Sequence, residues 1–280
     1  SLSQSPLAAD TLSDGSQALP RWEQLNPSLL HLKSKGALIA DREGRQIYAL
    51  QADQPRPIAS LTKLMTAMVI LDAKLPLEQA IKISKDDRDL IKLTGSRLAY
   101  GATLSRKELL SLALMSSENR AAAALARTYP GGTEAFVSAM NAKAQSLGMQ
   151  SSQFADPAGL APENIASPSD LALMVLAASE YPLIRTISTT QQHQVRPYKR
   201  RGPLRYVNTN RLLRNKRWDI ALSKTGYINE AGRCLAMLVD FEGTEMVMVF
   251  LDAYGKLTPF GDANRTRRWL QKGLSQATES

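Results

Sequence analysis

The side chains best suited to chemistry in this sequence are a serine and a lysine three positions apart, Ser60 and Lys63. They stand near the start of PIASLTKLMTAMVILDA, where we expect a helix over residues 60–73 that is apolar on nearly every side. Residues i and i+3 are neighbours on a helix, so the lysine would lie over the serine. Burial disfavours an ammonium and favours a neutral, basic amine. The pair therefore predicts nucleophilic attack by Ser60 with Lys63 as its base.

The same pair has a second reading, in which Ser60 caps the helix and Lys63 extends its amine to solvent. Ser-x-x-Lys is also short enough to occur by chance. The first turn of a helix, however, offers unpaired backbone N–H groups and the positive end of the helix dipole, and both suit an oxyanion. The position of Ser60 therefore favours the catalytic reading.

A second motif, MSSENR, places Ser117 and Asn119 in the short joint between two predicted helices. A joint of this kind aims a hydroxyl and an amide outward from rigid supports. The alternative is that Ser117 only caps a helix.

A third motif, LSKTGYIN, places Lys224, Thr225 and Gly226 on a predicted strand between apolar residues. A lysine is an unusual choice for the interior of a strand, and glycine lets a substrate backbone approach closely. The alternative is an edge strand with an exposed lysine.

The elements that must position these motifs are strands at both ends of the chain and helices between them. Period-2 runs and turn residues predict a hairpin over 36–50 and strands over 219–229, 233–243 and 245–253. Helical periodicity and capping signals predict helices over 60–73, 105–115, 118–129, 133–148, 167–181 and 262–274.

This order of elements predicts an α+β fold, in which one antiparallel sheet built from both ends of the chain is flanked by helices and joined by an all-helical lobe. We expect residues 1–24 to form a flexible tail and residues 25–280 a single domain. The sheet lobe would take about 25–85 and 206–280, and the helical lobe about 86–205. A cleft between two such lobes is a natural ligand site.

Composition excludes several kinds of site. His31, His193 and Cys234 are the only histidines and cysteine, so no zinc-ligand spacing and no internal disulfide are available. We expect Cys234 to be a buried strand residue. No apolar run reaches the roughly 18 residues of a membrane span.

The chain carries a net charge of +9, and much of the excess lies in residues 193–219. Such a segment attracts polyanions, either nucleic acid or a carboxylate-rich polymer, unless it is only a solvated surface. No aromatic stacking platform accompanies the arginines, which disfavours nucleic acid.

The order Ser-x-x-Lys, Ser-x-Asn, Lys-Thr-Gly is the signature of the penicillin-recognising serine acyltransferases. Over residues 30–270 the chain resembles the D-alanyl-D-alanine carboxypeptidase and endopeptidase family of low-molecular-mass penicillin-binding proteins. The stretches that carry the resemblance are 36–72, 114–126, 154–172 and 208–239. The resemblance implies the two-lobed α+β fold expected above, with the site between the lobes.

The resemblance also implies a role for each motif. Ser60 would be the acyl-ester nucleophile and Lys63 its proton acceptor. Ser117 would relay a proton to the leaving amine, and Asn119 would hold the substrate amide and the Lys63 side chain.

The third motif would receive the end of the substrate. Lys224 and Thr225 would bind its carboxylate, and Gly226 would leave room for it. The backbone N–H groups of Ser60 and Tyr227 would form the oxyanion hole. No metal or organic cofactor is implied.

Two departures from related patterns bear on specificity. Glu118 stands where much of the family has glycine in Ser-Gly-Asn. The segment at Glu163 doesn't match the Glu-x-x-Leu-Asn motif that drives deacylation in class A β-lactamases, so we expect a penicillin acyl-enzyme to hydrolyse slowly.

By resemblance, the expected function is a serine DD-peptidase that cleaves D-alanyl cross-links between peptidoglycan stem peptides, with β-lactams as covalent inhibitors. The alternatives are a carboxypeptidase that trims terminal D-Ala and a non-catalytic penicillin sensor. We expect a periplasmic protein whose signal peptide has been removed, with no nucleic-acid partner. The chain ends at Ser280, soon after the closing helix, so we expect at most peripheral membrane association.

Overall fold

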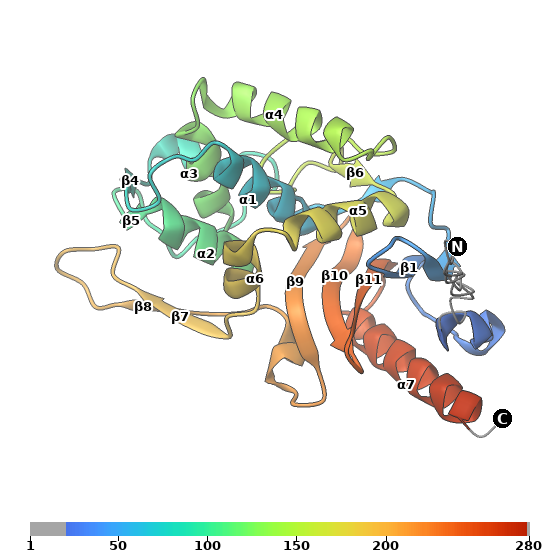
Figure 1. Cartoon of the computed structure of the whole chain (residues 1–280). Coiled ribbons are helices and arrows are strands. Elements are labelled where there is room, and N and C mark those ends of the chain that lie inside the picture. Colours follow the sequence, from blue (N-terminus) through green and yellow to red (C-terminus); the bar gives the residue numbers. More distant parts are fainter. Residues whose placement is uncertain (1–20, 279–280) are drawn as a thin grey trace, which may run out of the picture.

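The computed structural model describes residues 21–278 and contains a five-stranded antiparallel sheet in the order β2-β1-β11-β10-β9 (Figure 1). The strands are β1 (Gly36–Asp41), β2 (Gln46–Leu50), β9 (Asp219–Ile228), β10 (Gly232–Phe241) and β11 (Thr244–Ala253). Strand β11 pairs with β1, which joins the two ends of the chain in one sheet. The predicted α+β fold with an antiparallel sheet is therefore confirmed.

Strand β10 shows why the sheet is covered on both faces. Its residues Leu235, Met237 and Val239 pack in one core cluster with the closing helix α7 (Thr258–Thr278). The alternate residues Ala236 and Leu238 pack in the other cluster, with the remaining helices. Because successive side chains of a strand point to opposite faces, a run that is apolar throughout must be buried on both sides.

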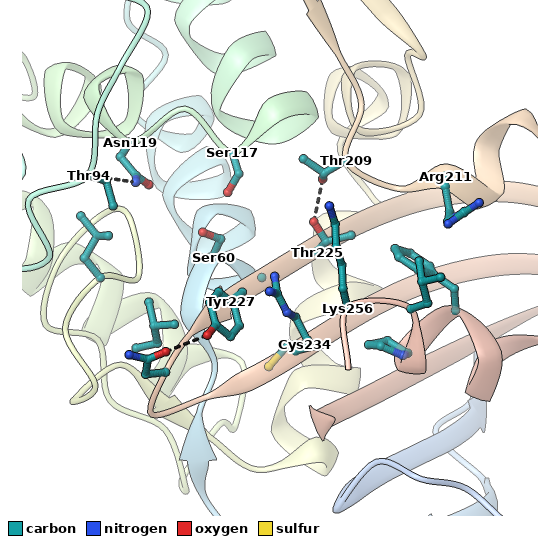
Figure 2. A pocket seen from close by; sticks show the side chains of 18 of the residues that line it. Ser60, Thr94, Ser117, Asn119, Thr209, Arg211, Thr225, Tyr227, Cys234 and Lys256 are labelled. Atoms are coloured by element: carbon teal, nitrogen blue, oxygen red, sulfur yellow. Dashed lines mark hydrogen bonds between the residues drawn. The ribbon is translucent and has the colours of Figure 1, made fainter. Parts of the chain in front are cut away.

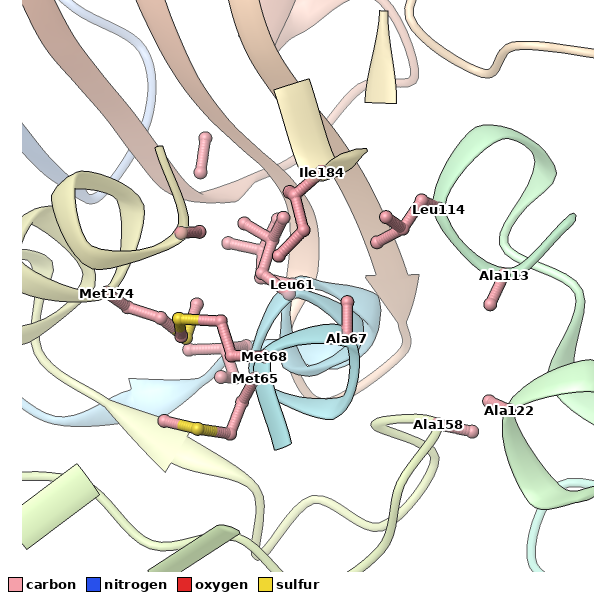
Figure 3. Close-up of a cluster of buried hydrophobic side chains, with 14 of the residues drawn as sticks. Leu61, Met65, Ala67, Met68, Ala113, Leu114, Ala122, Ala158, Met174 and Ile184 are labelled. Atoms are coloured by element: carbon pink, nitrogen blue, oxygen red, sulfur yellow. The ribbon is translucent and has the colours of Figure 1, made fainter. Parts of the chain in front are cut away.

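Helix α1 (Thr62–Asp72) runs through the middle of the helical layer and is buried over most of its length. It contacts α2 (Arg106–Ser116), α3 (Asn119–Arg127) and α4 (Gly132–Ser146), and on its other side α5 (Pro168–Ala178) and α6 (Pro182–Ser188). Figure 3 shows Met65 and Met68 of α1 lying toward Met174 of α5. A helix with neighbours on all sides needs an apolar surface all round.

The expected helix ends are present where capping residues indicated them. Ser105 and Glu108 form a capping box at the start of α2, and Ser167 caps α5. Gly148, with φ 78°, follows the end of α4.

Short elements complete the described chain. The 3₁₀ turns are η1 (Arg21–Gln24), η2 (Pro27–Leu29), η3 (Ala59–Leu61), η4 (Lys85–Asp87) and η5 (Arg211–Arg214). The two-stranded pairs are β3 (Arg56–Pro57) with β6 (Ile165–Ala166), β4 (Ala80–Lys82) with β5 (Thr103–Ser105), and β7 (Gln192–Val195) with β8 (Leu204–Val207).

The structure differs from the prediction in three places. Residues 21–24 form η1, and Trp22 packs in the core beside α7, so the flexible tail was wrong for these residues; residues 1–20 lie outside the described range. Helix α6 and the β7–β8 hairpin were not expected. Helix α5 packs against β1, β10 and β11, so it covers the sheet as well as meeting α1. The other lobe boundaries stay a prediction.

Among the described residues, no single helix is long and apolar enough to span a membrane, and only the sharply bent pair α5–α6 passes such a test by length and composition.

Candidate active site

Ser60 lies in the 3₁₀ turn η3, directly before α1 begins at Thr62. The expected helix over 60–73 is thus a 3₁₀ turn followed by an α-helix. Ala59 holds the left-handed φ of 50°, a value that costs energy for a residue with a Cβ. Two glycines pack against this turn: a Cβ at Gly226 would lie 2.8 Å from the Ser60 nitrogen, and one at Gly159 would lie 1.9 Å from the Ala59 oxygen. Only glycine fits at either position.

Lys63 is fully buried, and its Nζ reaches four oxygen atoms. It lies 2.8 Å from Ser60 Oγ and 3.0 Å from Ser117 Oγ. It also lies 2.8 Å from Asn119 Oδ1 and 3.0 Å from the Ala158 carbonyl oxygen. The reading of Lys63 as a snorkelling side chain is therefore wrong.

These four contacts suit a neutral amine at Lys63. The oxygens of Asn119 and Ala158 only accept hydrogen bonds, so they take the two N–H bonds of a neutral amine. The lone pair then faces the hydroxyls of Ser60 and Ser117. Burial lowers the pKa of Lys63 to about 7, although the carboxylates of Asp156, Glu118 and Asp89 partly oppose this shift. A neutral amine can thus form near neutral pH and accept a serine proton.

The joint between α2 and α3 supplies the second hydroxyl and the amide. Ser117 adopts the left-handed φ of 56° after the last residue of α2, and Asn119 is the first residue of α3. Asn119 Nδ2 donates to Thr94 Oγ1 at 3.1 Å, which orients the amide oxygen toward Lys63. The placement of both residues in a helix joint is confirmed.

Glu118, which raised a question about specificity, is buried beneath this joint rather than facing the substrate side. Its carboxylate accepts hydrogen bonds from the Arg120 backbone N–H and from Ser96 Oγ at 2.8 Å. It caps α3 and adds a negative charge that raises the pKa of Lys63.

Strand β9 is the edge strand of the sheet and lies beside η3. Lys224 is only 1% exposed, which rules out the exposed edge-strand lysine, and its Nζ donates to the Thr225 carbonyl at 2.8 Å. Burial and the nearby Lys63 charge lower its pKa. Thr225 Oγ1 donates to Thr209 Oγ1 at 2.6 Å. Tyr227 follows Gly226 along the strand, and its ring lies beneath the Arg233 guanidinium, 3.5 Å from the ring centroid.

One pocket of about 800 Å³ brings most of the predicted residues together. Figure 2 shows Ser60 with Ser117 above it and Thr225 beside it. The predicted residues that line this pocket are Ser60, Ser117, Asn119, Thr225, Gly226 and Tyr227. Lys63 and Lys224 are buried behind this lining.

The loop from Asp156 to Asn164 belongs to the site, although no motif of the sequence indicated its role. The Asp156 carboxylate accepts hydrogen bonds from the backbone N–H groups of four residues, 158–161, and from Asn164 Nδ2. This network holds the Ala158 carbonyl against Lys63. Thr66 of α1 donates to the Pro157 carbonyl at 2.7 Å and ties the loop to the helix.

Two residues at the end of this loop, Glu163 and Asn164, have different surroundings. Glu163 is exposed and does not line the pocket, while Asn164 is buried in the loop's hydrogen bonds.

The remaining candidate groups offer no competing chemistry within residues 21–278. Cys234 is buried as expected, and burial raises the pKa of its thiol to about 12, so it stays protonated. No group of three or more His, Cys, Asp or Glu residues in that range could hold a metal ion. His31 and His193 do not line the pocket.

A buried lysine shared by two serines, placed where an antiparallel sheet meets a helical layer, defines the class of penicillin-recognising serine acyltransferases. Comparison with known proteins is more specific. The family model described as D-alanyl-D-alanine carboxypeptidase matches residues 23–255, and the chain belongs to this family of serine DD-peptidases.

Individual relatives share most of their length with this chain. It is similar to the D-alanyl-D-alanine endopeptidase of Pseudomonas aeruginosa, with 46% identity over 88% of this chain and 80% of the relative. The D-alanyl-D-alanine endopeptidase of Escherichia coli is 44% identical over 86% of this chain and 78% of its own. The crystal structure of the Streptomyces K15 DD-transpeptidase has the same fold, with a TM-score of 0.80, 24% identity, and coverage of 86% of this chain and 98% of that one.

Proposed function

We propose that this serine DD-peptidase is an endopeptidase that cuts D-alanyl cross-links in peptidoglycan through an acyl-Ser60 intermediate. The observation that carries the proposal is the buried amine of Lys63, 2.8 Å from Ser60 Oγ and 3.0 Å from Ser117 Oγ. A base placed between two hydroxyls can take a proton from the nucleophile and pass one to the leaving group.

The acylation step follows from this placement. Ser60 Oγ attacks the D-alanyl carbonyl carbon while its proton moves to Lys63. The negative charge on the carbonyl oxygen is held by the backbone N–H groups of Ser60 and Tyr227. Losing one such donor typically costs about 100- to 1000-fold in rate. The C–N bond then breaks as Ser117 gives its proton to the leaving nitrogen and recovers one from Lys63.

Hydrolysis repeats the same chemistry with water. Lys63 takes a proton from a water molecule that attacks the ester, and Ser60 leaves with a proton returned through the same amine. Asn119 holds the substrate amide through Nδ2, and its Oδ1 holds Lys63. Thr225 and the charge of Lys224 hold the carboxylate beyond the scissile bond, and Gly226 lets η3 pack closely against this strand.

Preference for a cross-link over a terminal D-Ala is the finer part of the proposal. It is supported by the two relatives at 46% and 44% identity, both named D-alanyl-D-alanine endopeptidase. Carboxypeptidase action is the second candidate, favoured by the D-alanyl-D-alanine carboxypeptidase of a Streptomyces strain, which is 28% identical over 86% of this chain.

Two further properties belong to the proposal. A β-lactam should acylate Ser60 and leave slowly, because exposed Glu163 does not line the pocket and offers no base for a deacylating water there. The substrate lies outside the cytoplasmic membrane, so we place the enzyme in the periplasm, where it contributes to cell-wall turnover.

The nucleophile is tested by intact-mass measurement after incubation with a penicillin. The wild-type protein should gain the mass of one penicillin, and peptide mapping should place it on Ser60. Ser60→Ala should gain no mass and cleave no peptide, and Lys63→Ala should acylate more than about 100-fold more slowly. An adduct on Ser60→Ala would overturn the assignment.

The substrate preference is tested by offering cross-linked and uncross-linked muropeptides side by side. We expect the cross-linked dimer to be cut faster. Faster release of terminal D-Ala would instead identify a carboxypeptidase. A single burst of acylation without turnover would identify a sensor.

A further inference from the structure

A second hollow, the arginine groove, adjoins the pocket at Ser60. This hollow has a volume of about 880 Å³ and is lined in part by Arg211, Arg214, Lys216, Leu257 and Phe260. Four of these residues, all except Lys216, also line the pocket at Ser60. The two spaces are therefore adjacent.

The direction of the groove is set by strand β9 and the chain that precedes it. Thr225 on β9 is bonded to Thr209, which stands two residues before Arg211 at the start of η5. Figure 2 shows Ser60, then Thr225 with Thr209, then Arg211, in that order along the pocket. If Thr225 holds the carboxylate beyond the scissile bond, the rest of the leaving group extends toward Arg211.

The groove carries charge of one sign. Arg211, Arg214, Lys216 and Lys256 are exposed, and none of them has an ion pair among residues 21–278. No aspartate or glutamate is among the described residues that line either space. Lys92, which also lines the pocket at Ser60, differs from these cations because it is paired with Glu230.

Unpaired guanidinium groups in a cleft favour carboxylates as ligands. A cleft of one charge sign focuses the potential, and a guanidinium binds a carboxylate through two parallel hydrogen bonds. The apolar side chains of Leu257 and Phe260, which also line the groove, offer contacts for the aliphatic parts of a peptide.

We infer that the arginine groove binds the second stem peptide of a cross-link, with Arg211 and Arg214 holding its free carboxylates. The inference rests on the proposed function and adds what separates the two candidate substrates. A terminal D-Ala ends at Thr225 and does not reach Arg211. The leaving strand of a cross-link continues beyond that point, so the groove selects cross-linked substrates.

The test compares two substrates in the double variant Arg211→Gln with Arg214→Gln. The measured quantity is kcat/KM for a cross-linked muropeptide dimer divided by kcat/KM for the uncross-linked monomer. We expect this ratio to fall about 2- to 30-fold, the range for two exposed ion pairs. A ratio equal to that of the wild type would overturn the inference.

A charge-matched control separates the groove from general electrostatic attraction. Arg217→Gln with Arg268→Gln removes two exposed arginines that line neither space. The control should keep the wild-type ratio at low salt. An equal fall in both double variants would show long-range attraction only and would overturn the groove as a binding site.

A second arm changes the substrate instead of the enzyme. A dimer whose acceptor peptide has its carboxylates amidated should lose its advantage with the wild-type enzyme. It should be cut equally by the wild type and by Arg211→Gln with Arg214→Gln. If the wild type cuts no cross-linked dimer at all, the proposed function fails; if it cuts the dimer but discriminates neither variant nor amidation, only the groove fails.

Discussion

In the proposed mechanism, the burial of the Lys63 amine is what lets it activate Ser60. The side chain is fully buried. Its amine donates hydrogen bonds to Asn119 Oδ1 and to the Ala158 carbonyl, two oxygens that can only accept. The same burial lowers the pKa to about 7, against 10.5 for an ordinary lysine. The carboxylates of Asp156, Glu118 and Asp89 hold it from falling further. These three carboxylates and the burial together set the pKa of Lys63.

The acylation rate should therefore depend on pH through Lys63. Only the neutral amine accepts the Ser60 proton, so the second-order rate constant for penicillin acylation should fall about tenfold per pH unit below about 7 and level off just above it. Stopped-flow labelling with a fluorescent penicillin between pH 5 and 8 measures this. A flat profile over that range would contradict Lys63 as the base.

Asp156→Asn tests Lys63 a second time, through the direction in which the pH profile of acylation moves. The Asp156 carboxylate raises the pKa of Lys63, so its neutralisation should move the midpoint of the acylation profile to lower pH. Loss of a multiply bonded acceptor should also lower the free energy of unfolding by about 1–3 kcal/mol. Asp219→Asn, an exposed carboxylate with the same charge change, is the control and should leave the midpoint in place. A midpoint that stays put in Asp156→Asn would show that the loop acts on stability alone.

At the scale of elements, Ser60 is positioned by the turn η3, against which two other backbone segments pack. The loop that begins at Asp156 and strand β9 both pack against η3. Both contacts are made at glycines, Gly159 and Gly226. A side chain at either glycine would displace the turn and move Ser60 away from Lys63. Close packing at these two glycines therefore holds Ser60 in place.

Gly159→Ala tests this close packing. Gly159 has φ +83°, and an added Cβ would lie 1.9 Å from the Ala59 oxygen. Gly148 has nearly the same backbone, φ +78°, with nothing within 4 Å of an added Cβ. Gly148→Ala should therefore cost only the left-handed strain, about 1–2 kcal/mol, measured by urea unfolding. Gly159→Ala should cost more and should also slow acylation; equal costs with normal labelling would contradict a tight contact.

At the scale of the whole molecule, the site lies between the helical layer and the edge of the sheet. Ser60 and Lys63 belong to the helical layer, and Lys224 and Thr225 belong to the sheet edge. The β7–β8 hairpin extends from the helical side, apart from the sheet (Figure 1). It contains the exposed Arg200, Arg201 and Arg205 and carries part of the net charge of +9.

The hairpin is predicted to help hold the anionic wall polymer. Neutralising Arg200, Arg201 and Arg205 together to Gln should weaken binding to isolated sacculi at low salt, because exposed cations attract polyanions over roughly a Debye length. Pelleting assays at two salt concentrations measure the effect. The control removes three exposed cations elsewhere, Lys85, Arg88 and Lys107. Unchanged binding, or the same loss in the control, would reject a specific role for the hairpin.

The sequence by itself determined the strands, most helices and the identity of the chemical groups, because periodicity, caps and side-chain types are local. Tertiary structure alone decided three things. The Ala158 carbonyl became a partner of Lys63, and no pattern marks it because every residue has a carbonyl. Trp22 joined the core because α7 supplies a surface for it. Arg211 and Arg214 came to line one groove with Leu257 and Phe260, because groups more than 40 positions apart become neighbours only when the chain folds.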